Sequence, residues 1–495
     1  MKRFTVVSRA ACLLLACFLF LAGLFGQPPA AGYVYVVLWF DTEDYILPES
    51  DDAAKRIATF LTEQGIQATF KVVGEKARTL ERRHRDDVIA SLQKHAIGYH
   101  SNTHSQHPTP AEYESLLDWE NGVAEFTRQE RMGYDDVQRT FKQRPCCYGQ
   151  PGSSWAPQAF PALADWGVGL YLDEGTHVGL NGEPFYYGGL LNIFNTNEGP
   201  QLRPNEEWTN IEESKAKFRQ FYERMSRGGG LISLYFHPCE FIHSRFWDMN
   251  FADGANPPRD QWQIYPLRPQ ESQERAFSYL EQLVRYMHSF PKVRFITGRQ
   301  AIVLYADGAR GRRFDAKELS EIARQVGSEV TFQAREGYTL SPAEVMTLLS
   351  GWIAPPAKAA VALPFTVYGP SLPPPSLAEP LEVSWSQFER SVNDLHLYIQ
   401  RHHQIPGAVW LGSQPVAPEA FLVAMAKVVT HAESASGHPK TVTIEPAGLA
   451  TEKYVAQDSP EVWSWPIFPQ GFHSEHLIEL ARLQAWTLKP AKRRE

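Results

Sequence analysis

Short apolar runs alternate with amphipathic segments over roughly the first two thirds of the chain. The first run, residues 33–40, is Tyr-Val-Tyr-Val-Val-Leu-Trp-Phe. It is too continuously apolar for a strand with one face in water, so it predicts a buried parallel strand. A helix with Ile57, Phe60 and Leu61 on one face follows, and residues 68–73 predict the next strand.

This alternation continues to about residue 305. Further helices are expected near residues 88–94, 158–166, 214–225 and 275–288, and further strands at residues 97–99, 169–172, 231–236 and 293–296. Regular exchange of strand and helix is typical of α/β proteins. The pattern therefore predicts a parallel α/β barrel or open sheet over residues 33–305.

The pattern changes after Tyr305, where a polar connector, residues 308–313, precedes a region without the strand and helix rhythm. Two segments of this region look related. Residues 314–349 and residues 383–425 each predict a helix, a loop and a helix that begins at a proline. We expect a mainly helical accessory domain over residues 314–495.

The N-terminus has the pattern of an export signal. Basic residues Lys2, Arg3 and Arg9 precede an apolar run, residues 10–25, and a Pro- and Ala-rich exit. A buried core helix is the simpler alternative. Residues 1–31 thus predict an exported protein, periplasmic or extracellular. The run is also long enough for an uncleaved anchor, which would be the only contact with a membrane.

Length and charge narrow the class of protein. A chain of 495 residues exceeds one ordinary core, which suggests two domains or a large barrel with an appendage. With a formal charge of −8 it has no basic field for nucleic acid. Two of its five cysteines lie in the predicted signal. The three that remain, Cys146, Cys147 and Cys239, are not the even-numbered set that is typical of a disulfide-stabilised protein.

Ionisable residues stand at the ends of four predicted strands. Asp41, His100, Asp173 and His237 each follow directly after the last residue of a strand. Polar residues commonly end strands, but in a βα barrel this edge is the catalytic face, where the four would meet. The sequence therefore predicts one shared site.

The spacing of these residues favours a divalent metal. His100 and His104 place two imidazoles four positions apart, and Asp41, Glu43 and Asp44 place three carboxylates within four positions. Imidazole with carboxylate suits zinc, and a cation relieves the repulsion among the carboxylates. One carboxylate can ligate while another takes a proton from water. Two surface histidines and a solvated acidic turn are the alternative.

Residues 33–305 resemble the polysaccharide deacetylases with the NodB homology domain, which are also called carbohydrate esterase family four. The His-Ser/Thr-x-x-His motif of that family is matched by His100, Ser101 and His104. The resemblance implies a distorted (β/α) barrel of the NodB type. It also implies an Asp-His-His site for a metal, usually zinc.

The resemblance further assigns roles to single residues. Asp41 corresponds to the catalytic base, and the third metal ligand corresponds to Glu43 or Asp44. His237, in Leu-Tyr-Phe-His-Pro, corresponds to the general acid that protonates the departing amine. Asp173 corresponds to the acidic residue that orients or tunes this histidine.

One motif departs from the family pattern. Where the family commonly has Arg-x-Pro-x-Gly, this chain has Gln150 in place of the arginine that would pair with the base. A glutamine can hydrogen-bond a carboxylate but carries no charge, so the base is expected to be less stabilised as an anion. Gln150 and Trp155 are candidate substrate-binding residues, with Trp155 either in the groove wall or in the core.

The resemblance implies metal-dependent removal of N-acetyl groups from an envelope or extracellular amino-sugar polymer. Residues 383–425 also resemble a pseudomurein-binding repeat, which implies attachment to the cell wall. A plain helical domain that packs on the barrel is the alternative. Two other functions stay open: a catalytically impaired protein that binds wall polysaccharide, and an amidohydrolase of a small cyclic amide.

Overall fold

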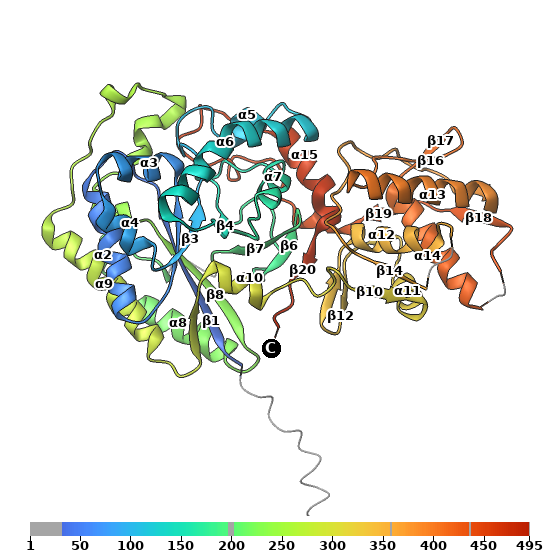
Figure 1. Cartoon of the computed structure of the whole chain (residues 1–495), viewed down its shortest axis with the longest axis horizontal. Helices are drawn as coiled ribbons and strands as arrows, with labels where there is room; N and C mark the ends of the chain where they lie inside the picture. The colour runs from blue at the N-terminus through green and yellow to red at the C-terminus, as the bar shows by residue number, and fades with distance from the viewer. Residues whose placement is uncertain (1–31, 197–201, 357–358, 435–436, 495) are drawn as a thin grey trace, which may run out of the picture.

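The computed structural model of the chain describes residues 32–196, 202–356, 359–434 and 437–494 (Figure 1). The predicted export signal, residues 1–31, lies outside this part of the chain. Among the described residues, no helix is both long enough and apolar enough to cross a membrane.

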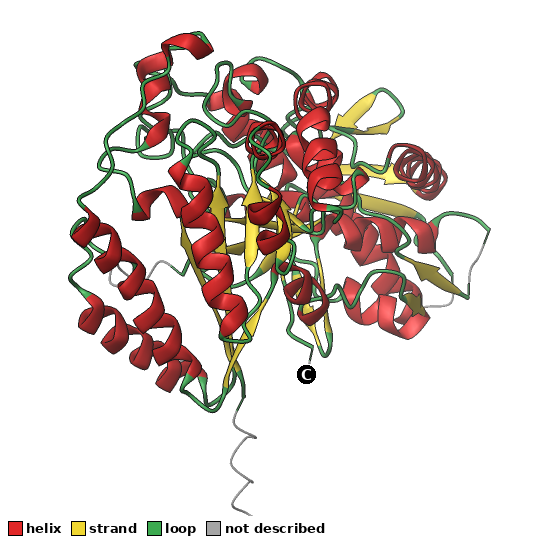
Figure 2. Cartoon of the chain, turned by 60° about the vertical axis from the view of Figure 1, so that its left-hand side comes forward, coloured by secondary structure: helices red, strands yellow, loops and turns green. Residues whose placement is uncertain are grey.

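The N-terminal part is built around one curled, mostly parallel sheet, which forms a half-barrel (Figure 2). Its strands run in the order β20-β6-β7-β5-β4-β3-β2-β1-β8, and β9 pairs with β1. They are β1 (Val34–Thr42), β2 (Thr69–Val72), β3 (Ala96–Tyr99), β4 (Cys147–Tyr148), β5 (Leu170–Asp173), β6 (Phe185–Tyr187), β7 (Leu190–Phe194), β8 (Gly230–Phe236), β9 (Val293–Ile296) and β20 (Lys489–Pro490). The backbone N–H of Thr196, just after β7, donates to the carbonyl of Ser233 in β8 at 2.9 Å. This bond brings two sides of the curl together, so the fold is the expected distorted α/β barrel.

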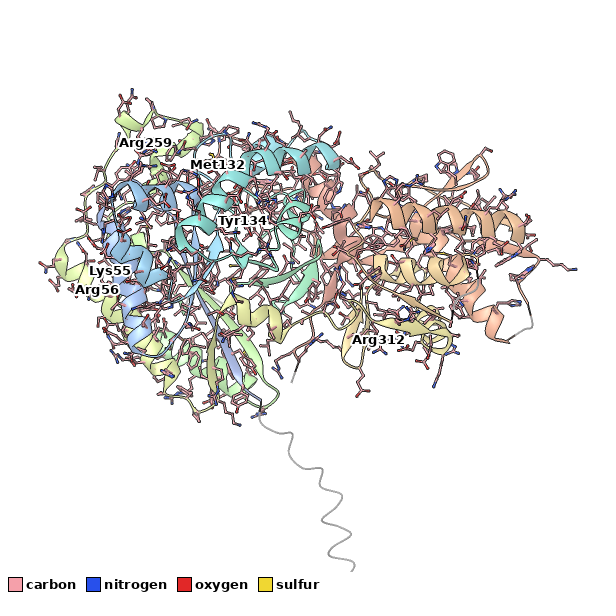
Figure 3. The ribbon with its side chains drawn as sticks, viewed as in Figure 1. Lys55, Arg56, Met132, Tyr134, Arg259 and Arg312 are labelled. Atoms are coloured by element: carbon pink, nitrogen blue, oxygen red, sulfur yellow. The ribbon has the colours of Figure 1, made fainter. Side chains whose placement is uncertain are left out.

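Helices cover the outer face of this sheet (Figure 2). They are α2 (Glu49–Glu63), α3 (Gly74–Arg82), α4 (Asp86–Leu92), α5 (Pro110–Glu114), α6 (Trp119–Phe141), α7 (Ala159–Asp165), α8 (Ile211–Met225) and α9 (Gln270–His288). Helix α10 (Gly298–Leu304) instead packs against the inner side. Short 3₁₀ segments η2 (Pro238–Phe241), η3 (Trp247–Gly254) and η4 (Arg259–Gln261) follow β8. Helix α6 shows the amphipathic rule: Tyr134 is buried against Trp166, whereas Met132 is 60% exposed (Figure 3).

Alternation along the strands divides the core into two layers. In β1, Leu38 and Phe40 face the helices, whereas Val37 and Trp39 face the inside of the curl, where Tyr235 stacks on Trp39 at 4.6 Å between ring centroids. Helix α10 contributes further side chains to the inner cluster. The inner layer is thus filled by apolar side chains up to the point where the strands end.

The C-terminal part contains two units of the same order: strand, helix, hairpin, helix, strand. The first has β10 (Arg313–Asp315), α11 (Ala316–Ala323), β12 (Gln333–Arg335), β13 (Tyr338–Leu340), α12 (Pro342–Ile353) and β14 (Ala360–Ala362). The second has β15 (Leu381–Ser384), α13 (Trp385–His402), β16 (Val409–Leu411), β17 (Gln414–Val416), α14 (Pro418–Ser434) and β18 (Thr441–Ile444). In both units the outer strands pair antiparallel, β10 with β14 and β15 with β18. The two related segments are therefore helical units that also contain small sheets, which the sequence did not predict.

The chain then returns to the barrel. A short parallel pair, β11 (Glu329–Val330) with β19 (Gly448–Leu449), precedes η5 (Ala450–Tyr454), α15 (Glu475–Gln484) and η6 (Ala485–Thr487). Strand β20 joins β6 antiparallel, and the buried Lys489 lies 2.8 Å from Asp307 and 2.7 Å from Glu344. The C-terminal part is therefore attached to the barrel by β20, which is a strand of the barrel's sheet, and by the ion pairs of Lys489.

Candidate active site

Along β1, β3 and β8, the side chains that point into the barrel are followed at the end of the strand by a polar residue of the candidate site. Asp41 continues the row of Val37 and Trp39 on β1, and His237 continues the row of Tyr235 on β8. His100 follows β3, whose Tyr99 faces the outer core. A period of two along each strand therefore turns these three side chains toward the same interior, above the apolar inner layer.

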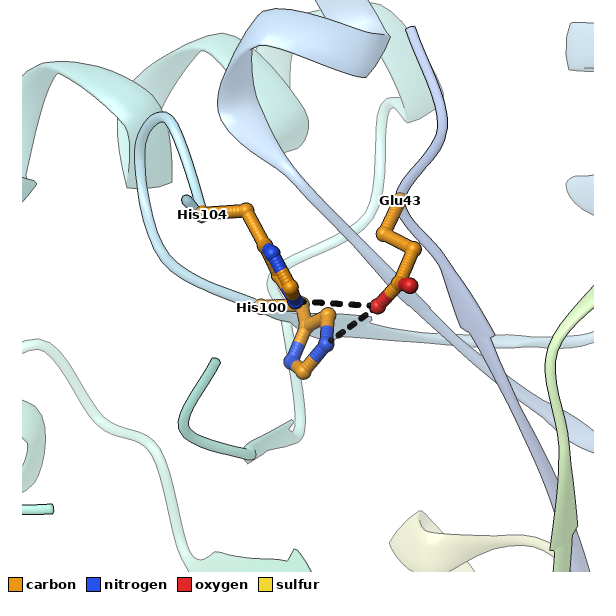
Figure 4. A group of neighbouring side chains, drawn as sticks. All are labelled: Glu43, His100 and His104. Carbon is orange, nitrogen blue, oxygen red and sulfur yellow. Dashed lines mark hydrogen bonds and ion pairs between the residues drawn. The ribbon is translucent and has the colours of Figure 1, made fainter. Parts of the chain in front are cut away.

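Glu43, His100 and His104 form a compact group in which one carboxylate oxygen faces two imidazoles (Figure 4). Glu43 Oε2 lies 3.1 Å from His100 Nε2 and 3.0 Å from His104 Nε2. All three side chains are buried, and their candidate ligand atoms lie within 4.8 Å of one another. Ser101 and His104 adopt positive φ values of 62° and 57°, so a tight loop brings the second histidine back beside the first.

The donors in this group fit a divalent metal. His100 Nδ1 is 2.9 Å from the carbonyl of Gly149 and His104 Nδ1 is 2.6 Å from Ser105 Oγ, so each ring has a partner on its far side. Such partners fix the tautomer and leave Nε2 free to ligate. Three protein donors of nitrogen and oxygen type are typical of a catalytic zinc site that keeps a position open.

Electrostatics favour the protonation states that a metal requires. Burial would raise the pKa of Glu43, but His104, His237 and the hydrogen bond with His100 outweigh it and hold the pKa well below its usual value. Burial also lowers the pKa of His104, against the opposing effect of Glu43. An ionised carboxylate and a neutral imidazole are the forms that ligate metals.

Asp44, the other candidate for the third ligand, faces away from this group. Its Oδ1 accepts hydrogen bonds from the backbone of Ile46 at 2.8 Å and of Leu47 at 3.1 Å, and its Oδ2 lies 3.0 Å from His243 Nε2. Successive side chains along a strand point to opposite faces, so Asp44 points away from the side of Asp41. The structure thus places Glu43 in the metal-binding group and Asp44 in the turn after β1.

A buried lysine that the sequence analysis did not single out bridges two of the predicted site residues. Lys71 Nζ lies 2.9 Å from Asp41 Oδ1, 3.1 Å from Asp173 Oδ2 and 2.8 Å from the carbonyl of Leu172. These three oxygens match the three N–H donors of an ammonium group. Burial would lower the pKa of Lys71, but Asp173 and Asp41 outweigh it and raise the pKa above its usual value.

This arrangement corrects one expectation about the base Asp41 and one about Asp173. Asp41 does have a cationic partner, because Lys71 supplies from β2 the charge that the motif's arginine would have supplied at Gln150. Gln150 instead accepts a hydrogen bond from Tyr171 at 2.6 Å. Asp173 contacts Lys71 and not His237; burial, only partly opposed by Lys71, raises its pKa to about 6.

Glycine is required beside this lysine. A Cβ at Gly149 would lie 2.0 Å from Lys71 Nζ and 2.5 Å from Asp173 Oδ2. The carbonyl of Gly149 is also the hydrogen-bond partner of His100 Nδ1. Lys71 and Asp41 are also direct partners in the register of β1 and β2. The backbone itself therefore positions the ion pair and the first histidine together.

His237 is held by a different carboxylate from the one expected. Its Nε2 lies 3.8 Å from Asp41 Oδ2, and its Nδ1 lies 3.6 Å from Glu240 Oε2. Arg203 in turn donates to Glu240 at 2.9 Å. Burial lowers the pKa of His237, but Glu43, Glu240 and Asp41 outweigh it and raise the pKa to about 9.

These residues border a cavity of about 280 Å³. It is lined by residues from the barrel loops and from one C-terminal segment: Asp41, Glu43, His100, His104, Gln150, Gly152, Asp173, Glu174, Tyr235, His237, Phe246, Asp248, Met249, Trp465 and Pro466. Trp155, a candidate for the wall, is instead a core residue, 3% exposed and stacked on His177 at 4.9 Å. The tryptophan in the cavity wall is Trp465.

Lys71, Glu240 and Trp465 were the site residues missed from the sequence. A lysine within an apolar strand was a signal for the first, since a buried lysine needs a partner. Glu240 lies three residues after His237 on the next short 3₁₀ segment, a spacing that could have indicated contact. For Trp465 the sequence had no local signal.

Comparisons with known proteins find only distant likenesses. No protein-family model matches the chain, and no curated protein matches it either. Solved structures that resemble it include one from Mycobacterium smegmatis described as a polysaccharide deacetylase (16% identity, 56% of this chain and 91% of that chain, TM-score 0.36). Others are a mutant CE4 family pseudoenzyme with restored enzymatic activity (13%, 55% and 67%, 0.28) and an allantoinase (13%, 56% and 92%, 0.37). All three TM-scores are below 0.5, so the activity has to be inferred from the site.

Proposed function

We propose that this protein is a metal-dependent hydrolase that removes N-acetyl groups from an envelope or extracellular amino-sugar polymer. The observation that carries the proposal is the position of Asp41: it lies beside the Glu43, His100 and His104 group and reaches His237 on its other side. A base and an acid therefore flank one place at which a metal can bind.

Glu43, His100 and His104 would hold the ion, most suitably zinc. Such an ion supplies a Lewis acid for the amide carbonyl and lowers the pKa of bound water. Asp41 would accept the proton of the attacking water, since Lys71 holds its Oδ1 in place and a lone pair remains on Oδ2. The Oδ2 atom faces His237, so proton acceptance and proton donation occur on neighbouring groups.

His237 would protonate the departing amine nitrogen. Burial lowers its pKa, but the nearby carboxylates of Glu43, Glu240 and Asp41 outweigh this effect and favour the protonated imidazole in the metal-free site. An amine is a poor leaving group unless it is protonated, so this acid is needed for C–N cleavage. Acetate and the free amino sugar would then leave the cavity.

The export pattern of residues 1–31 supports a polymer outside the cytoplasm as substrate, and wall attachment through the C-terminal units is part of the proposal. The alternative of an impaired binding protein rested on the missing arginine, and Lys71 removes that argument. An amidohydrolase of a cyclic amide would use the same donors, so the experiment includes such a substrate.

The test measures acetate release from N-acetylglucosamine oligomers together with bound metal. We expect zinc-loaded protein to release acetate, a chelator to abolish the release, and His104→Ala to lose both metal and activity because one of three donors is removed. The exposed His288 at the end of α9 offers a matched control, His288→Ala, which should retain both.

Three outcomes would contradict the proposal. Full metal occupancy in His104→Ala would refute the ligand assignment. Hydrolysis of a cyclic amide such as allantoin without acetate release would favour the amidohydrolase. Oligomer binding without any hydrolysis would favour a binding protein.

The pH dependence provides a separate test of the acid. Because nearby carboxylates raise the pKa of His237, its proton is present at lower pH and is lost as the pH rises through the raised pKa. Activity that needs this proton should decrease over the same pH range, which forms the alkaline limb of the pH–activity profile. Glu240→Gln keeps an acceptor for Arg203 but removes the charge beside Nδ1, so we expect the alkaline limb of kcat/KM to move down by roughly one to two pH units.

Wild type and Glu240→Gln should be compared with the same fraction of metal bound, so that any effect of Glu43 on the pKa of His237 is the same in both. Glu271→Gln on the exposed face of α9 is the matched control and should leave the limb in place. An unchanged limb in Glu240→Gln would show that Glu240 does not tune the acid.

A further inference from the structure

Residues 463–468 of the C-terminal part run along the candidate active site, and Trp465 and Pro466 of this segment line the cavity. The backbone of this segment accepts hydrogen bonds from the barrel, Asp253 to Pro466 at 3.1 Å and Gly254 to Ile467 at 3.0 Å. The side chain of Ile467 is fully buried. It belongs to the same small core as Tyr45 and Trp247. The segment is therefore built into the rim and is not a loose extension.

Trp465 is the side chain that this segment directs into the site. Its indole lies edge-on to the ring of His104, with 5.5 Å between centroids and 87° between planes, and its Nε1 lies 3.3 Å from Asp248 Oδ2. A Cβ at Gly152 would lie 2.3 Å from the indole, so the loop after β4 packs directly against it. Three separate parts of the barrel thus fix one half-buried ring beside the metal-binding group.

The size of the cavity limits what can bind there. A volume of about 280 Å³ is at the lower end of the range of about 300–1,000 Å³ for small-molecule sites. One sugar ring with its acetamido group suits such a space, whereas several consecutive rings would need an open groove. Trp465 and Pro466 line one side of this space.

We infer that Trp465 packs against the ring of the sugar that is being deacetylated, and that the site accepts an N-acetylated sugar at the end of a chain or in a short saccharide. This inference rests on the proposed function and specifies its substrate. The C–H face of a pyranose ring packs on an aromatic ring by dispersion and excludes water from it. Asp248 positions Trp465 through the hydrogen bond to Nε1.

The experiment compares wild type with Trp465→Ala and the conservative Trp465→Phe. Acetate release is measured on N-acetylglucosamine oligomers of increasing length and on a long polymer. Mass spectrometry of the products identifies which ring has lost its acetyl group. Tyr33, exposed just before β1 at the end of that strand opposite to Asp41, gives the matched aromatic control Tyr33→Ala.

We expect wild type to deacetylate one terminal ring of each oligomer. Trp465→Ala should raise KM roughly tenfold, equivalent to the loss of one aromatic contact, with a smaller change in kcat and unchanged zinc content. Trp465→Phe should recover most of this loss, and Tyr33→Ala should behave as wild type.

Deacetylation at internal rings by wild type, or an unchanged KM in Trp465→Ala, would overturn the inference while leaving the proposed function intact. If wild type releases no acetate from any sugar, the proposed function fails instead. Calorimetric titration with the oligomers then still tests the role of Trp465. Trp465→Ala should bind the oligomers more weakly than wild type, and equal binding would overturn the inference.

Discussion

Replacing Asp41 by asparagine is expected to lower kcat for acetate release by about 10²–10⁴-fold, the usual contribution of a general base, with little change in bound metal. Asparagine has the same shape but cannot accept the proton of the attacking water. Asp41 is not one of the three donors of the metal group, and its Oδ1 is 3.7 Å from His100 Nε2. Steady-state rates and metal analysis on the same samples test both parts.

The matched control is Asp135→Asn on the outer face of α6, where the exposed aspartate pairs with Arg131. This variant should keep wild-type kcat and metal content. Loss of zinc in Asp41→Asn would make Asp41 a ligand, and an unchanged kcat would require another base. Either result would contradict the role that the geometry assigns to Asp41.

Most of the rim could be predicted from the sequence because it depends on local rules. Strand positions follow from apolar runs, and a period of two then determines which side chain faces inward. Asp41, His100 and His237 all follow from this reasoning. Alternation also favours Glu43 over Asp44, although a turning chain prevented the sequence from deciding between them.

What the sequence could not provide were the contacts between distant segments. Lys71 is opposite Asp41 because of the register between β1 and β2, and a register is set by the packed sheet and not by either strand alone. Asp173 was assigned to His237 from the resemblance, but the position of Lys71 determines its partner. Trp465 reaches the site only because the C-terminal part returns across the rim.

The C-terminal part illustrates the same limit. Its two related segments were visible as helices that begin at prolines, and these are α12 and α14. The hairpins between the helices are only three residues per strand, too short for alternation to indicate them. Whether these units attach the protein to a wall polymer stays a prediction.

The lysine that bridges Asp41 and Asp173 provides the second large expected effect. Lys71→Met keeps the length of the side chain but leaves two buried carboxylates without a cation. Removing one partner of a buried ion pair typically costs about 3–5 kcal/mol, so we expect a fall of that size in the free energy of unfolding at neutral pH. Activity should fall as well, because the base loses the group that keeps it charged and oriented.

Chemical denaturation at two pH values tests the cause. Burial already raises the pKa of Asp173 to about 6, and without Lys71 this carboxyl should take up a proton at higher pH. Protonation relieves the repulsion, so the stability deficit of Lys71→Met should shrink as the pH falls from 8 to 5. A deficit that is independent of pH would show that lost packing, and not lost charge, causes it.

A double variant separates stability from catalysis. In Lys71→Met combined with Asp173→Asn, one of the two carboxylates is gone, so much of the stability should return while activity stays low. Lys55→Met is the matched control: its ammonium is 42% exposed and pairs with Asp87, so it should change stability by less than about 1 kcal/mol. Recovery of activity together with stability in the double variant would mean that Lys71 supports only the fold. Recovery of stability alone would assign Lys71 to the base, because Asp41 would then be folded in place but without its cation.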